Sequence, residues 1–444
     1  MRPPPAGAPT ATPRQSRPER VAARLATIAL ALGLLACSGG DGTEPPADTP
    51  PVRLLAFGGQ SNAGAGGRGT TMESQARFPN VRQFAGAGKA GLGSEPQAAA
   101  ALGPLVPAFD AADGGGQWPQ TMAGFAIAAT QPGVELVLRT DWYGGQAISA
   151  FLPGTTHFAN SLQAFAAARA QVERGGRRLE GSWYVWIQDE AGASTLDGYR
   201  EALRGYVLAL RAAAAAALGP PQPFTFVMLQ PNSWDSPSVY GFDVAFPDAV
   251  AQAQWELSRS MAGVLLAGPL YQVPLIATGD DGIHATALGR MMIGDLLAAV
   301  WAHGPGFRPL QPRSASLDGR VVELRFDRPA GALAWDEAWV APAPKRGFAF
   351  RDDAGSASIE SVEIVSPDTV RLVLSAPPTG ANPRVLYAHG TADELLDGWA
   401  AGRGQLMSPS SQASYFHRLG HAVPAQVNHY AVRFAVPVPW DAGR

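Results

Sequence analysis

The chain has 444 residues, of which 46% are apolar, and a formal net charge of −3. This length suffices for two or three domains with sizeable cores, and the ordinary apolar share argues against global disorder. No strongly basic stretch lies outside the N-terminus, so the sequence gives no indication of a nucleic-acid-binding surface.

The first fifty residues have the pattern of an export signal. An apolar run over residues 25–36 is too short to span a bilayer as a helix but is typical of a signal-peptide core. Five arginines precede it: Arg2, Arg14, Arg17, Arg20 and Arg24. The run ends in Leu-Leu-Ala-Cys, which resembles a bacterial lipobox and would make Cys37 the lipidated first residue of the mature protein.

We therefore expect a lipoprotein signal peptide over residues 1–36 and a flexible linker, rich in Gly and Pro, over residues 37–51. A lipid anchor on Cys37 would hold an exported bacterial protein in a membrane, at the outer membrane, in the periplasm or at the cell surface. The alternative is an ordinary secretory signal with an incidental cysteine. Cys37 is the single cysteine of the chain, so no intramolecular disulfide can form.

Residues 52–306 alternate between short apolar runs and longer helical patterns. The apolar runs are typical of buried parallel strands and lie at 53–57, 134–139, 182–187, 224–229 and 274–278. The helical patterns lie at 121–130, 195–218, 246–262 and 285–301. Alternation of this kind predicts an α/β fold with a parallel sheet and helices on both faces. Residues 64–118 form a long glycine-rich excursion that does not fit the pattern.

After residue 306 the pattern changes to short alternating segments separated by turn residues. These segments lie at 320–326, 346–352, 357–365, 369–375 and 384–390. They are typical of a small antiparallel sandwich, so we expect a β-sandwich-like domain over residues 307–444. Such a domain could bind glycan, cap a site or add stability, and its fold does not choose among these roles.

A serine follows the first predicted strand, in the stretch Gly-Gly-Gln-Ser-Asn-Ala-Gly at 58–64. Ser61 would stand at the carboxyl end of that strand, where the active sites of open α/β sheets form. The glycines before it permit unusual backbone angles. A serine hydroxyl is inert at neutral pH unless a base removes its proton, so a nucleophilic Ser61 requires a histidine at the same edge of the sheet.

His284 is the histidine that stands between the last predicted strand and the last predicted helix. Asp281 precedes it by three residues, a spacing that in a turn can bring the carboxylate onto Nδ1 of the same imidazole. This contact would fix the tautomer and leave Nε2 facing a nucleophile. Asp280 has a less suitable offset. Taken alone, the spacing is more typical of a solvated loop than of a catalytic site.

Four segments in chain order together resemble one family. They are Gly-Gln-Ser-Asn at 59–62, Gly-Gly-x-x-Ile at 144–148, Trp-x-Gln-x-Glu at 186–190 and Asp-Gly-x-His at 281–284. They resemble blocks of the SGNH/GDSL hydrolase superfamily, and within it the branch of sialate O-acetylesterases and acetylxylan esterases. The resemblance covers the α/β region and implies a flavodoxin-like doubly wound parallel sheet, the SGNH hydrolase fold, over residues 52–306.

The resemblance also implies a catalytic role for individual residues. Ser61 would be the nucleophile, His284 the base and Asp281 the carboxylate that orients the base. A tetrahedral oxyanion needs preorganised donors. The resemblance supplies them as the backbone N–H groups of Ser61 and Gly145 and the side-chain amide of Gln188.

Further residues of the same blocks would support the site: Gln60, Asn62, Gly144 and Glu190, the last as a brace for its loop. Two positions depart from the Trp-x-Gln-Gly-Glu block. Asp189 replaces its glycine, and Gly192 stands where an aspartate is common. Both departures bear on substrate preference more than on the nucleophile.

Together these features predict an exported serine esterase that removes acyl groups, acetyl above all, from an acylated carbohydrate. The reaction would pass through an acyl-enzyme and would require no metal or organic cofactor. Two alternatives remain open. One is a surface lipoprotein that binds glycan and whose esterase site has decayed, and the other is an esterase that acts on lipids or polyesters.

Overall fold

The computed structural model of the chain describes residues 50–64, 78–84, 105–107, 118–188, 195–219, 223–231, 246–276, 283–389, 398–400 and 402–443. All of them belong to one compact unit, Asp48–Arg444. The predicted signal peptide, Cys37 and all but the last two residues of the linker lie outside the described residues, as does most of the glycine-rich excursion. No helix within the described ranges is long and apolar enough to cross a membrane.

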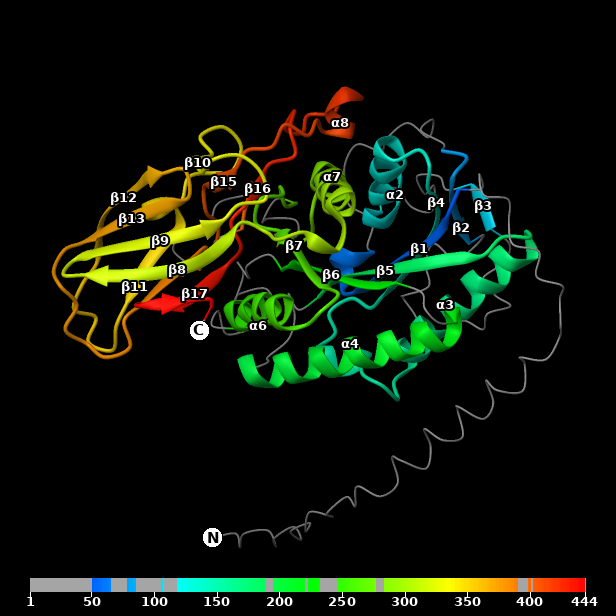
Figure 1. The fold of residues 1–444 in the computed structure, drawn as a ribbon, viewed down its shortest axis with the longest axis horizontal. Helices are drawn as coiled ribbons and strands as arrows, with labels where there is room; N and C mark the ends of the chain where they lie inside the picture. The colour runs from blue at the N-terminus through cyan, green and yellow to red at the C-terminus, as the bar shows by residue number, and fades with distance from the viewer. Residues whose placement is uncertain are drawn as a thin grey trace, which may run out of the picture. The chain divides into compact units, whose positions relative to one another are not determined.

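A seven-stranded sheet forms the centre of the N-terminal half (Figure 1). In spatial order its strands are β3 (Leu105–Pro107), β2 (Val81–Phe84), β4 (Glu135–Trp142), β1 (Val52–Gly59), β5 (Leu179–Ile187), β6 (Phe224–Gln230) and β7 (Val264–Pro269). Six strands are parallel, and the short edge strand β3 is antiparallel to β2. The parallel α/β sheet predicted from the sequence is confirmed.

Strand β1 lies inside the sheet, between β4 and β5. The chain leaves β1 towards the β4 side and later returns on the other side as β5, so the strand order reverses at β1. In open α/β sheets such a reversal leaves a crevice beyond the carboxyl ends of the strands. Ser61 follows β1 at this end of the sheet.

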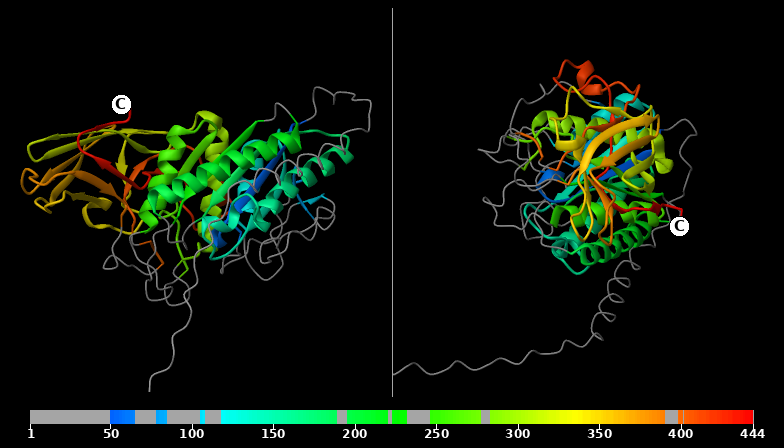
Figure 2. Two further views of the ribbon diagram at one scale, coloured as in Figure 1. Left: turned by 90° about the horizontal axis from the view of Figure 1, so that it is seen from below. Right: turned by 90° about the vertical axis from the view of Figure 1, so that its left-hand side faces the viewer.

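Helices cover both faces of the sheet. One face carries α2 (Pro119–Thr130) and α7 (Ala287–His303), and the other carries α3 (Thr156–Arg174), α4 (Leu196–Leu218) and α6 (Phe246–Ser260) (Figure 1). Within the second group, α3 and α4 run side by side (Figure 2, left).

Successive side chains of a strand point to opposite faces. In β1, Leu54 and Ala56 join the apolar cluster under α3, α4 and α6. Leu55 and Phe57 join the cluster under α2 and α7. This burial on two sides explains why the strand is an almost unbroken apolar run.

The C-terminal part consists of antiparallel sheets, as the alternating pattern predicts. The largest has the order β12-β13-β9-β8-β18, and two smaller sheets have the orders β10-β15-β16 and β11-β14-β17. The strands are β8 (Gln311–Asp318), β9 (Val321–Asp327), β10 (Ala334–Trp335), β11 (Phe348–Arg351), β12 (Ile359–Ser366), β13 (Thr369–Leu374), β14 (Arg384–Tyr387), β15 (Leu406–Ser408), β16 (His429–Tyr430), β17 (Phe434–Pro437) and β18 (Trp440–Asp441). A four-residue helix, α8 (Tyr415–Arg418), follows β15.

Side-chain amides of the α/β part bind main chain of the antiparallel part. Gln230, at the end of β6, donates from Nε2 to Arg433 O at 3.0 Å, and its Oε1 accepts from Arg433 N at 2.8 Å. Gln252 on α6 makes the same pair of bonds with Ala435, at 3.2 and 2.9 Å. One apolar cluster also continues from β6 and α6 into β9, β13 and β17. The two parts therefore share a core.

Two elements differ from the sequence-based expectation. The last parallel strand is β7, whereas residues 274–276 form only an isolated bridge through Leu275, and 277–278 lie outside the described residues. Two apolar runs lie close together here, and Pro274 in the second lacks the N–H that a sheet ladder needs. The other difference is α3, which the pattern did not predict because its first turn mixes polar, aromatic and small residues.

Candidate active site

Ser61 lies on a sharp turn that the two preceding glycines permit. Gly59 has a φ of +122°, in the region that favours glycine. A Cβ at Gly59 would overlap the carbonyl oxygen of Ile187, and a Cβ at Gly58 would overlap the hydroxyl of Tyr184. Ser61 then begins a short 3-10 helix. The turn thus lies closer to β5 than a chain with side chains at these positions could.

Hydrogen bonds hold this turn against its neighbours on two sides. Gln60 N donates to Ile187 O at 2.8 Å, and Tyr143 N donates to Gly59 O at 2.8 Å. The Gln60 side chain is buried, and its Nε2 donates to Gln146 O at 2.7 Å. The nucleophile turn is therefore tied both to the end of β5 and to the loop that follows β4.

The structure brings Ser61 and His284 into contact. Nε2 of His284 lies 2.6 Å from Oγ of Ser61, although 223 positions separate the two residues in the sequence. Both side chains are half-buried. A neutral imidazole in this position can accept the proton of the hydroxyl. Asp281 and Asp280 lie outside the described residues, so the orienting carboxylate stays a prediction.

His284 lies on a short segment that precedes α7. Its carbonyl oxygen accepts a hydrogen bond from Ile276 N at 2.9 Å, which pairs it with the segment 274–276. Thr286 then caps the helix, because its hydroxyl accepts from Gly289 N at 3.1 Å. His284 is thus held directly before a seventeen-residue helix.

The supporting residue Asn62 contacts the segment of the base. Its side chain is 1% exposed. Nδ2 donates to Ile283 O at 3.3 Å, and Oδ1 accepts from Ala285 N at 3.0 Å. These two residues flank His284 on either side. Asn62 therefore binds the residues on both sides of His284 and directly follows Ser61 in the sequence.

The loop after β4 passes beside Ser61, as expected for a loop that contributes to an oxyanion hole. A Cβ at Gly144 would lie 3.9 Å from Cβ of Ser61. Gly145 has a φ of +67°, a left-handed conformation that favours glycine. The geometry thus places Gly144 next to Ser61.

Gln188 follows β5 and is fully buried. Its Oε1 accepts from the hydroxyl of Tyr199 at 3.0 Å, and its Nε2 donates to Gln146 O at 3.1 Å. The carbonyl oxygen of Gln146 can only accept, so it must face Nε2, and Oε1 is then left to accept from Tyr199. Glu190 and the two departures, Asp189 and Gly192, lie outside the described residues.

A buried charge pair, missed at the sequence level, lies behind the nucleophile turn. Arg139 Nη2 and Asp141 Oδ1 of β4 are 2.5 Å apart, each side chain 2% exposed, and Asp141 is paired in register with Gly58. Burial raises the pKa of Asp141, an effect that the Arg139 charge opposes but does not cancel. The signal was the alternation of two charged residues in an apolar strand, which places both on one face.

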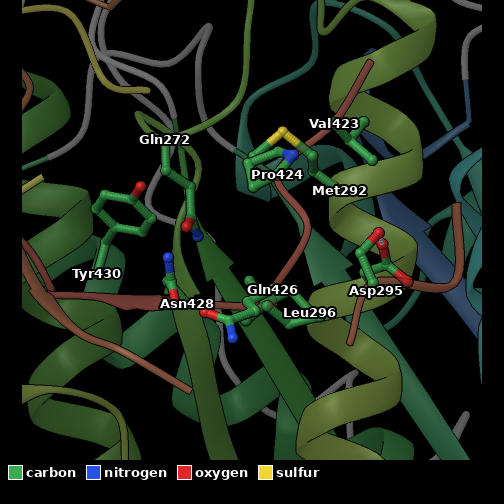
Figure 3. Close-up of a pocket in the computed structure, with 11 residues that line it drawn as sticks. Gln272, Met292, Asp295, Leu296, Val423, Pro424, Gln426, Asn428 and Tyr430 are labelled. Atoms are coloured by element: carbon green, nitrogen blue, oxygen red, sulfur yellow. Dashed lines mark hydrogen bonds between the residues drawn. The ribbon is translucent and has the colours of Figure 1, made fainter. Parts of the chain in front are cut away.

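A small cavity lies elsewhere, between α7 and the C-terminal residues 414–430 (Figure 3). Its volume is about 30 Å³, enough for roughly one water molecule. Asp295 of α7 lines it, accepting from Ser414 Oγ at 2.5 Å and from Tyr415 N at 3.0 Å. Burial raises the pKa of Asp295 to about 6, although these hydrogen bonds lower it. This cavity lies where α7 packs against the C-terminal residues, and it is not the candidate active site.

No protein-family model and no curated protein sequence matches the chain. Among solved structures, the chain is similar to a carbohydrate acetylesterase from Xanthomonas citri, with a TM-score of 0.55 and 16% identity over 86% of this chain and 80% of that one. It also aligns with NanS (TM-score 0.40, 12% identity, 58% of this chain and 99% of that one). A carbohydrate acetylesterase, Est24 from Sinorhizobium meliloti, aligns with a TM-score of 0.33 and 12% identity over 56% of this chain and 98% of that one.

At these identities the comparisons establish the fold and not the reaction. The first of them covers more of the chain than the α/β part contains, so the likeness includes antiparallel strands of the C-terminal part. The chain therefore has a parallel α/β sheet with an antiparallel β part, in an arrangement shared with a carbohydrate acetylesterase.

Proposed function

We propose that this chain is a serine esterase that removes acetyl groups from a carbohydrate, and that it belongs to the sialate O-acetylesterase-like branch of the SGNH hydrolases. The observation that carries the proposal is the 2.6 Å contact between Ser61 Oγ and His284 Nε2. The contact lies at the carboxyl end of β1, where the strand order reverses.

Two further observations support the family assignment. The fold is shared with a carbohydrate acetylesterase. With the short β2–β3 excursion set aside, the strand order is β4-β1-β5-β6-β7. This is the order 2-1-3-4-5 of flavodoxin-like sheets, in which ligands bind at the first strand.

In the proposed reaction, Ser61 Oγ attacks the carbonyl carbon of the acetyl ester while His284 Nε2 takes the hydroxyl proton. The tetrahedral intermediate collapses as the C–O bond to the sugar breaks, and His284 returns the proton to the leaving sugar oxygen. Water then attacks the acetyl-enzyme with His284 again as the base, which releases acetate and restores Ser61. Asp281 is the proposed carboxylate on Nδ1 of His284.

The oxyanion of the intermediate requires donors that are already in place. Ser61 is the first residue of a 3-10 helix, and the first N–H groups of a helix have no acceptor within it. We therefore assign its N–H to the oxyanion hole, together with the N–H of Gly145 beside it and the Nε2 group of Gln188. Tyr199 and Gln146 hold that amide in orientation.

The proposal includes export and a lipid anchor on Cys37, supported by the apolar run and the lipobox-like end of residues 25–37. A Gly/Pro-rich tether of fourteen residues follows Cys37 before β1 begins at Val52. From its composition we expect such a tether to stay extended. It would let a membrane-held esterase reach a polymeric substrate.

The test is hydrolysis of p-nitrophenyl acetate by the wild type, by Ser61→Ala and by Ser258→Ala. Ser258 lies on α6, where its hydroxyl donates to Trp255 O at 2.7 Å, and serves as the matched serine control. We expect Ser61→Ala to lose about 10⁴-fold in kcat/KM and Ser258→Ala to keep wild-type activity. Activity of Ser61→Ala close to that of the wild type would refute the assignment of Ser61 as the nucleophile of a serine esterase.

Two measurements separate the alternatives. A series of p-nitrophenyl acetate, butyrate and octanoate esters tests chain length, and a preference for octanoate would favour a lipid or polyester substrate. Labelling with a fluorophosphonate tests whether Ser61 is reactive at all. A folded protein that binds acetylated glycan but takes up no label at Ser61 would favour the decayed, glycan-binding alternative.

A further inference from the structure

The main chain around His284 is bound along both of its edges. In an extended segment, the carbonyl of one residue and the N–H of the second residue after it point to the same edge, and the carbonyl between them points to the other. Ile283 O and Ala285 N point to Asn62, at 3.3 and 3.0 Å. His284 O points away from it, to Ile276 N at 2.9 Å.

Residues 274–276 bind the edge opposite Asn62 and are themselves bound by the C-terminal part. Leu275 pairs with Ala285 in an antiparallel bridge. Leu275 N donates to Gly398 O at 2.8 Å, and Trp339 Nε1 donates to Gln272 O at 3.0 Å. Residues 272–276 are therefore tied to the C-terminal part, and these bonds do not depend on Asn62.

Asn62 is the residue that links this segment to Ser61. It follows Ser61 directly, and both lie in the same short 3-10 helix. A planar side-chain amide carries a donor and an acceptor side by side, so it can bind two main-chain groups as a neighbouring strand would. If the nucleophile turn shifts, the two bonds shift the segment of the base with it.

We propose that Asn62 is a positioning residue that sets the distance between His284 Nε2 and Ser61 Oγ by clamping the main chain on both sides of His284. The inference rests on the proposed esterase function. Asn62 acts through the main chain on both sides of His284. Its loss leaves the pairing with residues 274–276 in place. The segment around His284 then keeps its conformation, but the distance from His284 Nε2 to Ser61 Oγ is no longer fixed.

The test compares Asn62→Ala and the milder Asn62→Ser with the wild type. Misplacement of a catalytic group by about 1 Å costs on the order of 10²-fold in rate. We therefore expect Asn62→Ala to lower kcat for p-nitrophenyl acetate about 10²-fold while KM changes little. The rate of fluorophosphonate labelling at Ser61 should fall in the same proportion, because labelling also needs the base. A side chain that served stability alone would leave kcat of the folded fraction unchanged.

Asn80→Ala is the matched control. Asn80 also binds main chain across the sheet, with Nδ2 donating to Val134 O at 2.8 Å, but at the opposite end of the strands. It is expected to retain the wild-type kcat and labelling rate. Circular dichroism and the thermal midpoint establish that each variant is folded. If Asn62→Ala does not unfold cooperatively, the same measurements of kcat and labelling rate on Asn62→Ser test the inference instead.

The outcomes separate this inference from the proposed function. If Ser61→Ala is inactive and the folded Asn62 variant keeps kcat and the labelling rate within about threefold of the wild type, the positioning role is wrong and the esterase assignment stands. If Ser61→Ala keeps wild-type activity, the assignment itself is wrong. A fall in kcat and labelling in Asn62→Ala, absent from Asn80→Ala, supports the inference.

Discussion

Replacing Asp295 by asparagine is expected to remove a pH dependence of stability between about pH 4 and pH 6. Burial raises the pKa of Asp295 from 3.8 to about 6 in the folded protein. The folded state then binds its proton more tightly than the unfolded state does, so stability is greatest below pH 3.8 and falls as the pH rises to about 6. At about 1.4 kcal/mol per pH unit, the change is roughly 3 kcal/mol.

The assay is urea unfolding of the wild type and Asp295→Asn at several pH values from 4 to 7.5. The difference in unfolding free energy between the two proteins isolates the carboxyl from all other titrating groups. It should change by roughly 3 kcal/mol in favour of the variant as the pH rises. Ser414→Ala removes a hydrogen bond that lowers the pKa of Asp295, so the change should extend to higher pH. A difference that stays constant across this range would refute the reasoning.

Three further predictions concern the site and the anchor. Gln188→Ala should lower kcat for p-nitrophenyl acetate about 10²-fold if its amide donates to the oxyanion, and a near-normal kcat would take Gln188 out of the oxyanion hole. Tyr199→Phe removes the hydroxyl that orients this amide and should cost less than Gln188→Ala. When the chain is produced in a bacterial host with labelled palmitate, the wild type should carry the label and Cys37→Ala should not; a wild type without label would contradict the lipoprotein prediction.

The part of the fold that follows from local pattern was readable from the sequence. Strand β1 is apolar on both faces because helices cover both faces of the sheet. A continuous apolar run of this length predicts a buried parallel strand. The C-terminal strands β9 and β13 alternate because one face of each is buried and the other is partly exposed. The contact of Ser61 with His284 was expected from motifs at two predicted strand ends, and the structure brings these residues together.

Features that depend on distant partners were not readable. The apolar runs at 264–269 and 274–278 differ little in composition, and the partner β6 makes the first a strand. The charge pair of Arg139 and Asp141 exists because α3 covers that face, and α3 itself was not predicted. The role of Asn62 depends on contacts with residues more than 220 positions away, which no local pattern encodes.

The paired amide bonds of Gln230 and Gln252 limit how this protein can be divided or recombined. A module on a linker can move between proteins because few contacts cross its boundary. Here four hydrogen bonds to Arg433 and Ala435, together with a continuous apolar cluster, cross between the two parts. Losing either part would expose to water the apolar side chains that the shared cluster buries in the other. Because this core and these bonds cross between the two parts, we expect the α/β sheet and the antiparallel sheets to unfold together rather than as separate modules.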